Sequence, residues 1–240
     1  MIYIQSDDER SLPHHFDAAC AMYGAISRGL DYRLTSYDEV AFGKFDKLIT
    51  TRLFVGSVEF LSEVFSRAGK KDPRVPMNSD RESQTMSLGK FRNLIQSGQT
   101  LFVKPKQIKL FTGCVIDKMF LSSLSPYPED TEVLVYEPFK SPILSEWRLY
   151  VHYGKIVDGK NYSGDFKISP DWKLAQEKIS SFKNFPVSYT CDVAILSDPS
   201  GKETTEIVEL NDMWAIGNYG IPNDLYLRLL RERYFEIMRG

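Results

Sequence analysis

The stretch TEIVELNDMWAIGNYG, residues 205–220, combines a short apolar strand with side chains that carry oxygen atoms. Ile207 and Val208 begin the apolar part, and Glu209 and Asn211 interrupt it two residues apart. On an extended backbone, residues at this spacing project from the same face. A carboxylate and an amide oxygen side by side suit a hard cation such as Mg²⁺, which prefers oxygen ligands and usually also binds substrate phosphates. The stretch therefore predicts a strand that carries a magnesium site.

Asp192 is a further carboxylate within the apolar stretch CDVAIL, residues 191–196. An unpaired carboxylate in an apolar strand is costly. Asp192, Glu209 and Asn211 on two neighbouring strands would offset that cost if cations and phosphates lay between them. The alternative is an aspartate near a strand end that is bonded to the backbone.

Lysines occur at and after the end of an apolar strand in LFVKPKQIKLFTG, residues 101–113. Lys104 ends the strand, and Lys109, Thr112 and Gly113 lie in the loop that follows. Lysines anchored by a strand can neutralise a polyphosphate, and the backbone N–H groups of a loop can cover it. The stretch lacks the glycine and lysine spacing of a P-loop, so a solvated basic turn is the alternative.

The stretch VLVYEPFKSPILSEWRLYV, residues 133–151, holds two further candidate groups. Its first strand runs into Glu137 and a proline that ends ladder pairing, and backbone groups at such an exit can hydrogen-bond an adenine edge. Farther on, Glu146, Arg148 and Tyr150 alternate and so share one strand face. An acid and an arginine on one face either line a ligand or simply pair across the sheet.

Composition excludes several classes of protein. Thirty Lys+Arg against thirty-two Asp+Glu give a net charge of −2, which disfavours a general attraction to nucleic acid or to anionic membranes. Three widely spaced cysteines, Cys20, Cys114 and Cys191, argue against a disulfide framework and a cysteine-rich zinc site, and fit a reducing cytoplasm. No apolar run approaches the roughly 20 residues needed to cross a bilayer. We expect a cytoplasmic protein.

Strands alternate with helices in the first 86 residues, which predicts a small α/β lobe with a largely parallel sheet. The predicted strands are 1–5, 32–34 and 47–51, and the predicted helices are 16–26 and one that is capped by Ser57 and stops before Gly69. Residues 70–86 are rich in polar groups and indicate a connector.

From residue 99 the pattern indicates an α+β region with antiparallel pairing, and Gly154 between two apolar runs is a hairpin signal. The predicted strands are 101–104, 114–116, 132–136, 146–153, 155–161, 187–196 and 206–211. The predicted helices run from Ser87 through Ile95, from Pro170 to about Phe182, and over 223–238 after Pro222.

In this order, the features resemble the ATP-grasp superfamily, and within it a clade of compact phage and bacterial proteins. The stretches that carry the resemblance are FVGSVEFL (54–61), FVKPKQIKLFTG (102–113), EWRLYVHYGKIVDGKNYSGD (146–165) and VELNDMWAIGNYG (208–220). The resemblance covers about residues 87–220. It implies an α+β ATP-grasp fold, in which two lobes clasp ATP, over 87–240, preceded by a small α/β lobe over 1–86.

The resemblance also implies a role for each matching position. Residues expected at the ATP phosphates are Lys104, Lys109, Thr112 and Gly113. Residues expected at the adenine and ribose are Val135, Tyr136, Glu137 and Glu146. Expected Mg²⁺ ligands are Asp192, Glu209 and Asn211, and expected catalytic residues are Arg148, Lys109 and Lys160. One departure is Thr190, where many members have an arginine.

The resemblance implies an ATP- and Mg²⁺-dependent ligase that joins a carboxylate to an amine, of an amino acid or a peptide, through an acyl-phosphate, with release of ADP and phosphate. Lysines, an arginine and metal-binding acids suit such chemistry because it depends on positioning and charge neutralisation. Two alternatives stay open: a nucleotide-binding module without turnover, and a kinase that phosphorylates a hydroxyl group. The sequence leaves the oligomeric state open.

Overall fold

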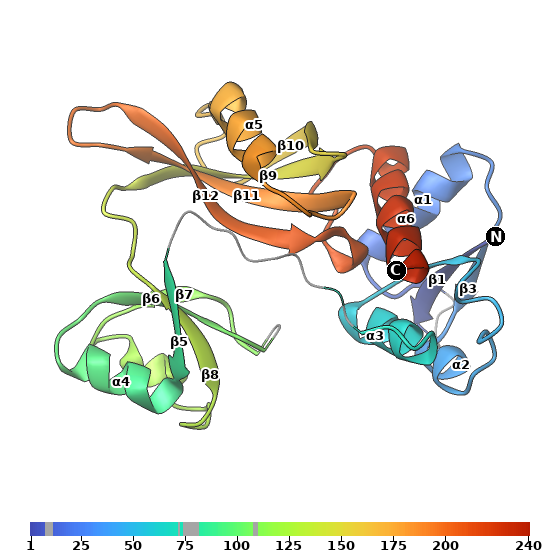
Figure 1. Ribbon diagram of the computed structural model, residues 1–240, viewed down its shortest axis with the longest axis horizontal. Coiled ribbons are helices and arrows are strands. Elements are labelled where there is room, and N and C mark those ends of the chain that lie inside the picture. The colour runs from blue at the N-terminus through green and yellow to red at the C-terminus, as the bar shows by residue number, and fades with distance from the viewer. Residues whose placement is uncertain (8–11, 72, 74–81, 108–109) are drawn as a thin grey trace. The chain divides into compact units, whose positions relative to one another are not determined.

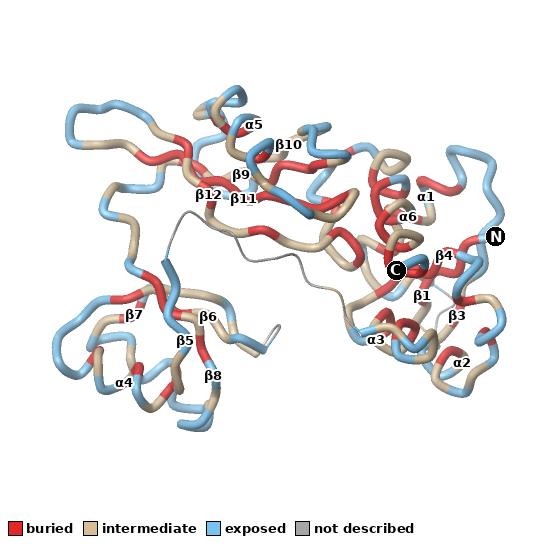
Figure 2. The backbone as a smooth tube through the Cα atoms, in the orientation of Figure 1, coloured by how far each residue is buried: buried red, intermediate tan, exposed pale blue. Residues whose placement is uncertain are grey.

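The computed structural model describes residues 1–7, 12–71, 73, 82–107 and 110–240, and the chain forms two compact units (Figure 1). Unit 1 combines residues 1–77 with residues 143–240, and unit 2 is the continuous segment 78–142. Each unit has its own buried apolar core (Figure 2). The predicted domains, 1–86 and 87–240, stay a prediction, because the two units describe packing and not family domains.

The first sheet of unit 1 is built around β1, which has a parallel partner on each side. Its elements are β1 (Ile2–Asp7), β2 (Leu12–Pro13), α1 (Phe16–Ser27), β3 (Tyr32–Thr35), α2 (Tyr37–Ala41), β4 (Leu53–Val55) and α3 (Val58–Arg67). Strands β3 and β4 pair parallel with β1, and β2 pairs antiparallel with its end. The Ser57 hydroxyl accepts a hydrogen bond from the N–H of Phe60 and starts α3, as predicted.

The strand predicted over residues 47–51 is wrong, because this segment forms turns. The N–H of Ile49 donates to the carbonyl of Phe45 at 3.2 Å, and the N–H of Arg52 donates to the carbonyl of Leu48 at 2.8 Å. This helical spacing places Phe45 and Ile49 on one side, where both are buried. The neighbouring strand, β4, begins two residues later than the predicted strand ended.

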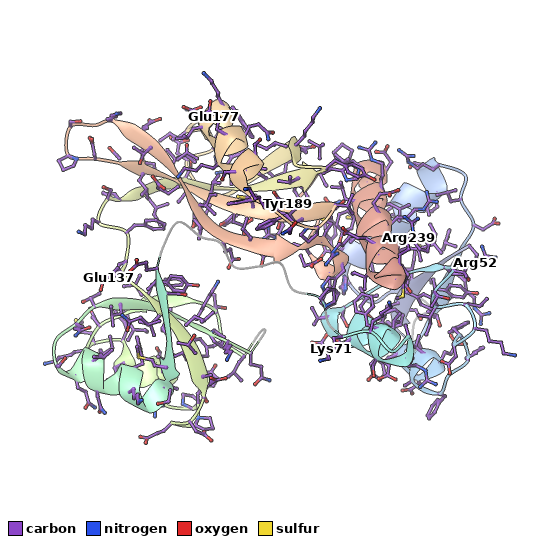
Figure 3. The ribbon with its side chains drawn as sticks, in the orientation of Figure 1. Arg52, Lys71, Glu137, Glu177, Tyr189 and Arg239 are labelled. Carbon is purple, nitrogen blue, oxygen red and sulfur yellow. The ribbon has the colours of Figure 1, made fainter. Side chains whose placement is uncertain are left out.

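The second sheet of unit 1 is antiparallel, with the strand order β10-β9-β11-β12. Its elements are β9 (Ile143–His152), β10 (Lys155–Gly164), α5 (Trp172–Ser181), β11 (Ser188–Ser197) and β12 (Glu203–Asp212). Helix α5 covers one face (Figure 1), and its residues Ala175 and Ile179 pack on Leu149 and Tyr189 of the sheet. In Figure 3, Tyr189 lies in this layer and Glu177 points outward from α5.

The central position of β11 explains its near-continuous apolar sequence. Nine of its ten residues are buried (Figure 2), because it is paired on both edges and packed on both faces. The hairpin between β9 and β10 is confirmed as well. Tyr153 and Gly154 have φ angles of 47° and 70°, as the favoured two-residue hairpin turn requires.

After β12 come a 3₁₀ turn, η2 (Met213–Ala215), and the last helix, α6 (Asn223–Arg239), which starts directly after Pro222 as predicted. Helix α6 packs beside α1 (Figure 1), and at the contact a Cβ atom on Gly24 would overlap the carbonyl oxygen of Asn223. Arg233 of α6 is buried and donates two hydrogen bonds to Asp212, at 2.8 and 2.7 Å. This pair fastens the end of β12 to α6.

Unit 2 contains a four-stranded sheet with the order β5-β8-β6-β7 and one helix on its core. Its elements are β5 (Ser83–Ser87), α4 (Leu88–Gln96), β6 (Leu101–Pro105), β7 (Cys114–Ile116), η1 (Leu121–Leu124) and β8 (Glu132–Tyr136). Ser87 caps α4, as predicted. The connector predicted over 70–86 is wrong for residues 83–86, which belong to β5. This strand pairs on one edge with β8 and is largely exposed, so it lacks an apolar pattern.

None of the helices in the described segments is long and apolar enough to cross a membrane.

Candidate functional site

Four of the predicted site residues lie in one row across the sheet β10-β9-β11-β12. Glu209 lies opposite Asp192, Asp192 lies opposite Arg148, and Arg148 lies opposite Lys160. Residues directly opposite one another on antiparallel strands share a face. Because the neighbouring residues pack under α5, this row occupies the other face of the sheet. The structure thus brings together residues that lie far apart in the sequence.

The centre of the row is a buried ion pair. Arg148 donates from Nε to Oδ1 of Asp192 at 2.8 Å and from Nη2 to Oδ2 at 2.7 Å. The side chains of Arg148 and Asp192 are only 8% and 3% exposed, so little water competes with these bonds. Of the interpretations left open by the sequence, Arg148 does pair across a sheet, and its partner is Asp192.

The electrostatic setting of Asp192 follows from its burial. Burial raises the pKa of its carboxyl from the ordinary 3.8 to about 6, and the charges of Glu209 and Glu146 act in the same direction. The guanidinium of Arg148 opposes this rise in pKa by stabilising the carboxylate. The ion pair therefore sets the charge of the row near neutral pH.

The expected Mg²⁺ ligands fit a cation in part. Glu209 and Asn211 lie side by side on β12, and Nδ2 of Asn211 donates to Oε1 of Glu209 at 3.0 Å. A carboxylate and an amide in contact suit an ion that also keeps waters and phosphate oxygens as ligands. Asp192 fits less well, because both of its oxygens accept bonds from Arg148. Over the described residues, no group of three or more His, Cys, Asp or Glu could hold a metal.

The flanks of the row carry the other predicted residues of unit 1. Lys160 on β10 forms an ion pair with Asp158 at 3.3 Å. Glu146 lies on β9 opposite Ala194 and is partly buried. Thr190, at the position where the resemblance expects an arginine, is fully buried, and its hydroxyl has no hydrogen-bond partner among the described residues.

In unit 2, the predicted phosphate-binding and adenine-binding residues lie on adjoining strands. Lys104 is on β6, and its Nζ lies 5.6 Å from the centre of the Tyr136 ring on β8. A Cβ atom on Gly113 would lie 3.1 Å from the Cβ of Lys104 and 2.8 Å from the Phe102 ring. Gly113 therefore allows the loop before β7 to pass close to Lys104.

The remaining predicted residues of unit 2 differ in exposure. Val135 is 5% exposed and packs in the core of unit 2, so a ligand role would depend on its backbone. Thr112 and Glu137 are exposed, and Glu137 directly follows β8 (Figure 3). Lys109 lies outside the described residues.

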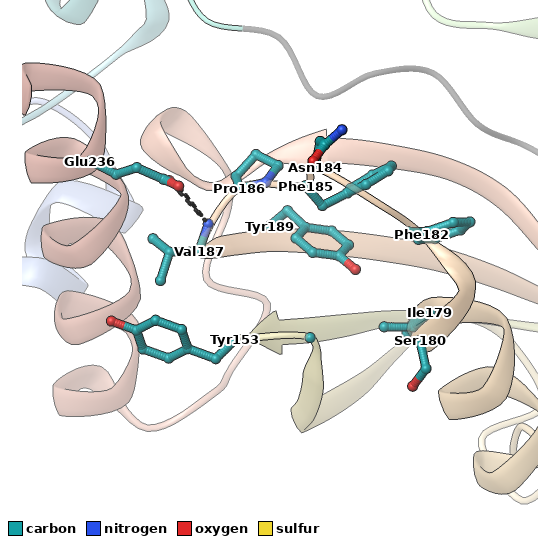
Figure 4. A pocket seen from close by; sticks show the side chains of 11 residues that line it. Tyr153, Ile179, Ser180, Phe182, Asn184, Phe185, Pro186, Val187, Tyr189 and Glu236 are labelled. Carbon is teal, nitrogen blue, oxygen red and sulfur yellow. Dashed lines mark hydrogen bonds between the residues drawn. The ribbon is translucent and has the colours of Figure 1, made fainter. Parts of the chain in front are cut away.

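A pocket of about 380 Å³ opens elsewhere on unit 1, at the beginning of β11 (Figure 4). Aromatic side chains dominate its lining, among them Phe182, Phe185 and Tyr189. At its rim the carboxylate of Glu236 accepts bonds from the N–H of Val187 at 3.1 and 3.0 Å. None of the predicted site residues lines this pocket.

A family model for an ATP-grasp domain, the second family of its clade, matches residues 81–229 of the chain. The chain belongs to this ATP-grasp family. The match spans more than half of the chain, so the predicted membership of the ATP-grasp superfamily and the predicted α+β ATP-grasp fold are confirmed.

Solved structures that are similar to this ATP-grasp chain are only distantly related to it. A RimK domain protein ATP-grasp from Sphaerobacter thermophilus is 13% identical with a TM-score of 0.48, and the alignment covers 100% of both chains. The ATP-grasp ligase PsnB bound to a minimal precursor is 12% identical over 96% of this chain and 98% of PsnB, with a TM-score of 0.46. D-alanine–D-alanine ligase from Bacillus anthracis is 13% identical over 99% of this chain and 97% of that ligase, with a TM-score of 0.46.

Likenesses at these scores do not bear on the activity of this ATP-grasp chain, so its family rests on the family model alone. None of the curated proteins compared with the chain matches it.

Sequence reasoning missed one side chain of this ATP-grasp site. The ring of Tyr219 lies over Arg148, with 4.3 Å between the guanidinium carbon and the ring centre. A tyrosine between Gly217 and Gly220 in a loop was the available signal, since glycines allow the close approach and turning that position a side chain.

Proposed function

We propose that this chain is an ATP- and Mg²⁺-dependent ligase that joins the carboxylate of a small molecule or peptide to an amine. The carboxylate oxygen would displace ADP from the γ-phosphorus of ATP and form an acyl-phosphate. The amine nitrogen would then attack the carbonyl carbon, phosphate would leave, and the nitrogen would lose a proton to solvent. Family membership supports ATP as the nucleotide.

The observation that carries this proposal is the row of charged side chains across the second sheet of unit 1. Arg148 and Lys160 present positive charge beside Glu209 and Asp192. Phosphoryl transfer relies on fixed charges around the moving group, and a row on paired strands holds such charges firmly. Arg148 would neutralise the transferred phosphoryl group, and Lys160 would face the substrate.

Mg²⁺ would neutralise charge on the ATP phosphates, and Glu209 and Asn211 are the residues whose oxygens fit it. Asp192 would join them only if its ion pair with Arg148 opened. In the same proposal the ATP phosphates would contact Lys104, Lys109, Thr112 and Gly113. The adenine and ribose would contact Val135, Tyr136, Glu137 and Glu146.

Incubation with Mg-ATP and a panel of amino acids and short peptides tests the ligase proposal. We expect at least one carboxylate–amine combination to stimulate ADP release and to yield an amide, detected by mass spectrometry. Glu209→Ala should abolish this stimulation. Glu206→Ala is the matched control, because Glu206 is on the same strand but is bonded to Lys178 of α5 at 2.8 Å.

A nucleotide-binding module without turnover is the second candidate. The buried Thr190 at the position of an expected arginine favours it, because one positive charge is then missing from the site. Tight ATP binding without stimulated ADP release across the panel would establish the module, and a phosphorylated hydroxyl product would establish a kinase. The near-neutral charge gives no support for a nucleic-acid partner, and a cytoplasmic location stays a prediction.

A further inference from the structure

The loop between β12 and α6 contains a residue in an unusual backbone conformation. Tyr219 has a φ of 50°, in the left-handed region that non-glycine residues seldom adopt. Such a conformation costs on the order of 1 kcal/mol and persists only where the surroundings hold it. The Tyr219 side chain is also 48% exposed, so burial of its ring does not offset this cost in full.

Hydrogen bonds hold the backbone on both sides of Tyr219. The N–H of Asn218 donates to Asp17 of α1 at 2.8 Å, and the N–H of Gly220 donates to the side-chain oxygen of Asn218 at 2.7 Å. The Tyr150 hydroxyl contacts the carbonyl oxygen of Asn218 at 2.6 Å. The loop is therefore fixed to α1 and to β9, and it presents Tyr219 in one orientation.

The Tyr219 ring fits a space that its neighbours leave for it. A Cβ atom on Gly217 would lie 3.0 Å from the ring, so the glycine lets the ring fold back against the loop. From there the ring covers the guanidinium of Arg148 at 4.3 Å. The ring of Tyr162 on β10 meets it edge-on at 5.6 Å between centres.

Arg148 is thereby held from two directions. Asp192 takes one N–H from Nε and one from Nη2, and Tyr219 covers a face of the guanidinium plane. In the described part of the chain no residue accepts a hydrogen bond from Nη1. An arginine edge with in-plane N–H groups is well shaped for two oxygens of a phosphoryl or carboxylate group.

We propose that Tyr219 is a positioning residue that fixes the plane of the Arg148 guanidinium, so that its unused edge meets the oxygens of the phosphoryl group or acyl-phosphate. This role rests on the proposed ligase function. The bonds to Asp192 hold the guanidinium along one edge, and the ring adds the contact that stops the plane from tilting. An attraction of a cation to a ring face of about 1–2 kcal/mol when desolvated suffices for this task.

The test compares Tyr219→Leu, which removes the ring, with Tyr219→Phe, which keeps it. The first measurement is the NMR signal of the Arg148 Nε–H in the protein without substrate, identified by its loss in Arg148→Lys. We expect Tyr219→Leu to move this signal, because the ring current disappears, and Tyr219→Phe to leave it in place. This measurement needs no turnover, so it tests the positioning even if the ligase proposal fails.

The second measurement is substrate-stimulated ADP release. We expect Tyr219→Leu to lower kcat by about tenfold with little change in the KM for ATP, and Tyr219→Phe to restore it. Tyr153→Leu is the matched control, because Tyr153 also has a left-handed φ, of 47°, and is 70% exposed. An unmoved Arg148 signal in Tyr219→Leu, or a Tyr219→Phe variant as impaired as Tyr219→Leu, would overturn the proposal.

Discussion

Replacing Arg148 with methionine should make the stability of unit 1 depend on pH in a new range. Methionine keeps much of the aliphatic packing but leaves the buried Asp192 without its cation. The carboxyl pKa, already about 6 in the native protein, should then rise above the neutral range, because burial remains and the opposing charge is gone. Asp192 would stay protonated in the folded variant while it ionises in the unfolded chain.

The sign follows from proton uptake. A carboxyl whose folded pKa lies above its unfolded value of 3.8 binds more protons when folded, so stability falls as pH rises between the two pKa values. In the native protein this fall ends near pH 6, where Asp192 ionises. In Arg148→Met it should continue at about 1.4 kcal/mol per pH unit. The variant should therefore lose about 3 kcal/mol relative to the native protein by about pH 8 and little by about pH 5.

Urea unfolding followed by tryptophan fluorescence measures this difference in unit 1, because Trp147, Trp172 and Trp214 all belong to it. The double variant Arg148→Met with Asp192→Asn should remove the new pH dependence. Arg28→Met is the control, since Arg28 pairs with Asp224 at 3.0 Å where both side chains are 46% exposed, and it should change stability little at any pH. A stability loss in Arg148→Met that is equal at low and high pH would refute the reasoning.

Three further changes test separate parts of the molecule. Thr190→Val should keep or raise the free energy of unfolding, by up to about 1 kcal/mol, because it removes a buried hydroxyl that has no partner among the described residues; a clear loss in urea unfolding would contradict this. Lys104→Ala should weaken ATP binding about tenfold in calorimetry through the lost phosphate contact, whereas Lys106→Ala, the control, should not, and equal affinities would remove the proposed role. Asn211→Ala should raise the Mg²⁺ concentration needed for ATP turnover while the melting temperature stays unchanged, and an unaltered Mg²⁺ requirement would remove Asn211 from the metal site.

Local signals in the sequence predicted much of the fold. The hydroxyls of Ser57 and Ser87 do cap helices, and the turn at Gly154 does close a hairpin. These features depend on the residue type and a few neighbours, so the sequence alone suffices. The polar edge strand β5 and the turns over 47–51 were missed, because edge strands need no apolar face and β-branched residues also occur in turns.

The candidate site was predictable only in its residue types. Alternation places Arg148 on one strand face and spacing places Glu209 with Asn211, but neither shows which strands become neighbours. The pairing of Arg148 with Asp192 depends on the register of β9 against β11, which the tertiary fold sets. The contact of Tyr219 with Arg148 depends on a loop conformation held by Asp17, far away in the sequence, so no local pattern could reveal it.

The close fit of Gly24 against the start of α6 has a consequence for how this sequence can diverge. A methyl group at position 24 would push Asn223 away, and the loop that carries Tyr219 ends just before that residue. An exchange in the first helix would thus be felt at Arg148 without touching it. Substitutions at position 24 should survive in descendants of this chain only together with compensating changes near residue 223.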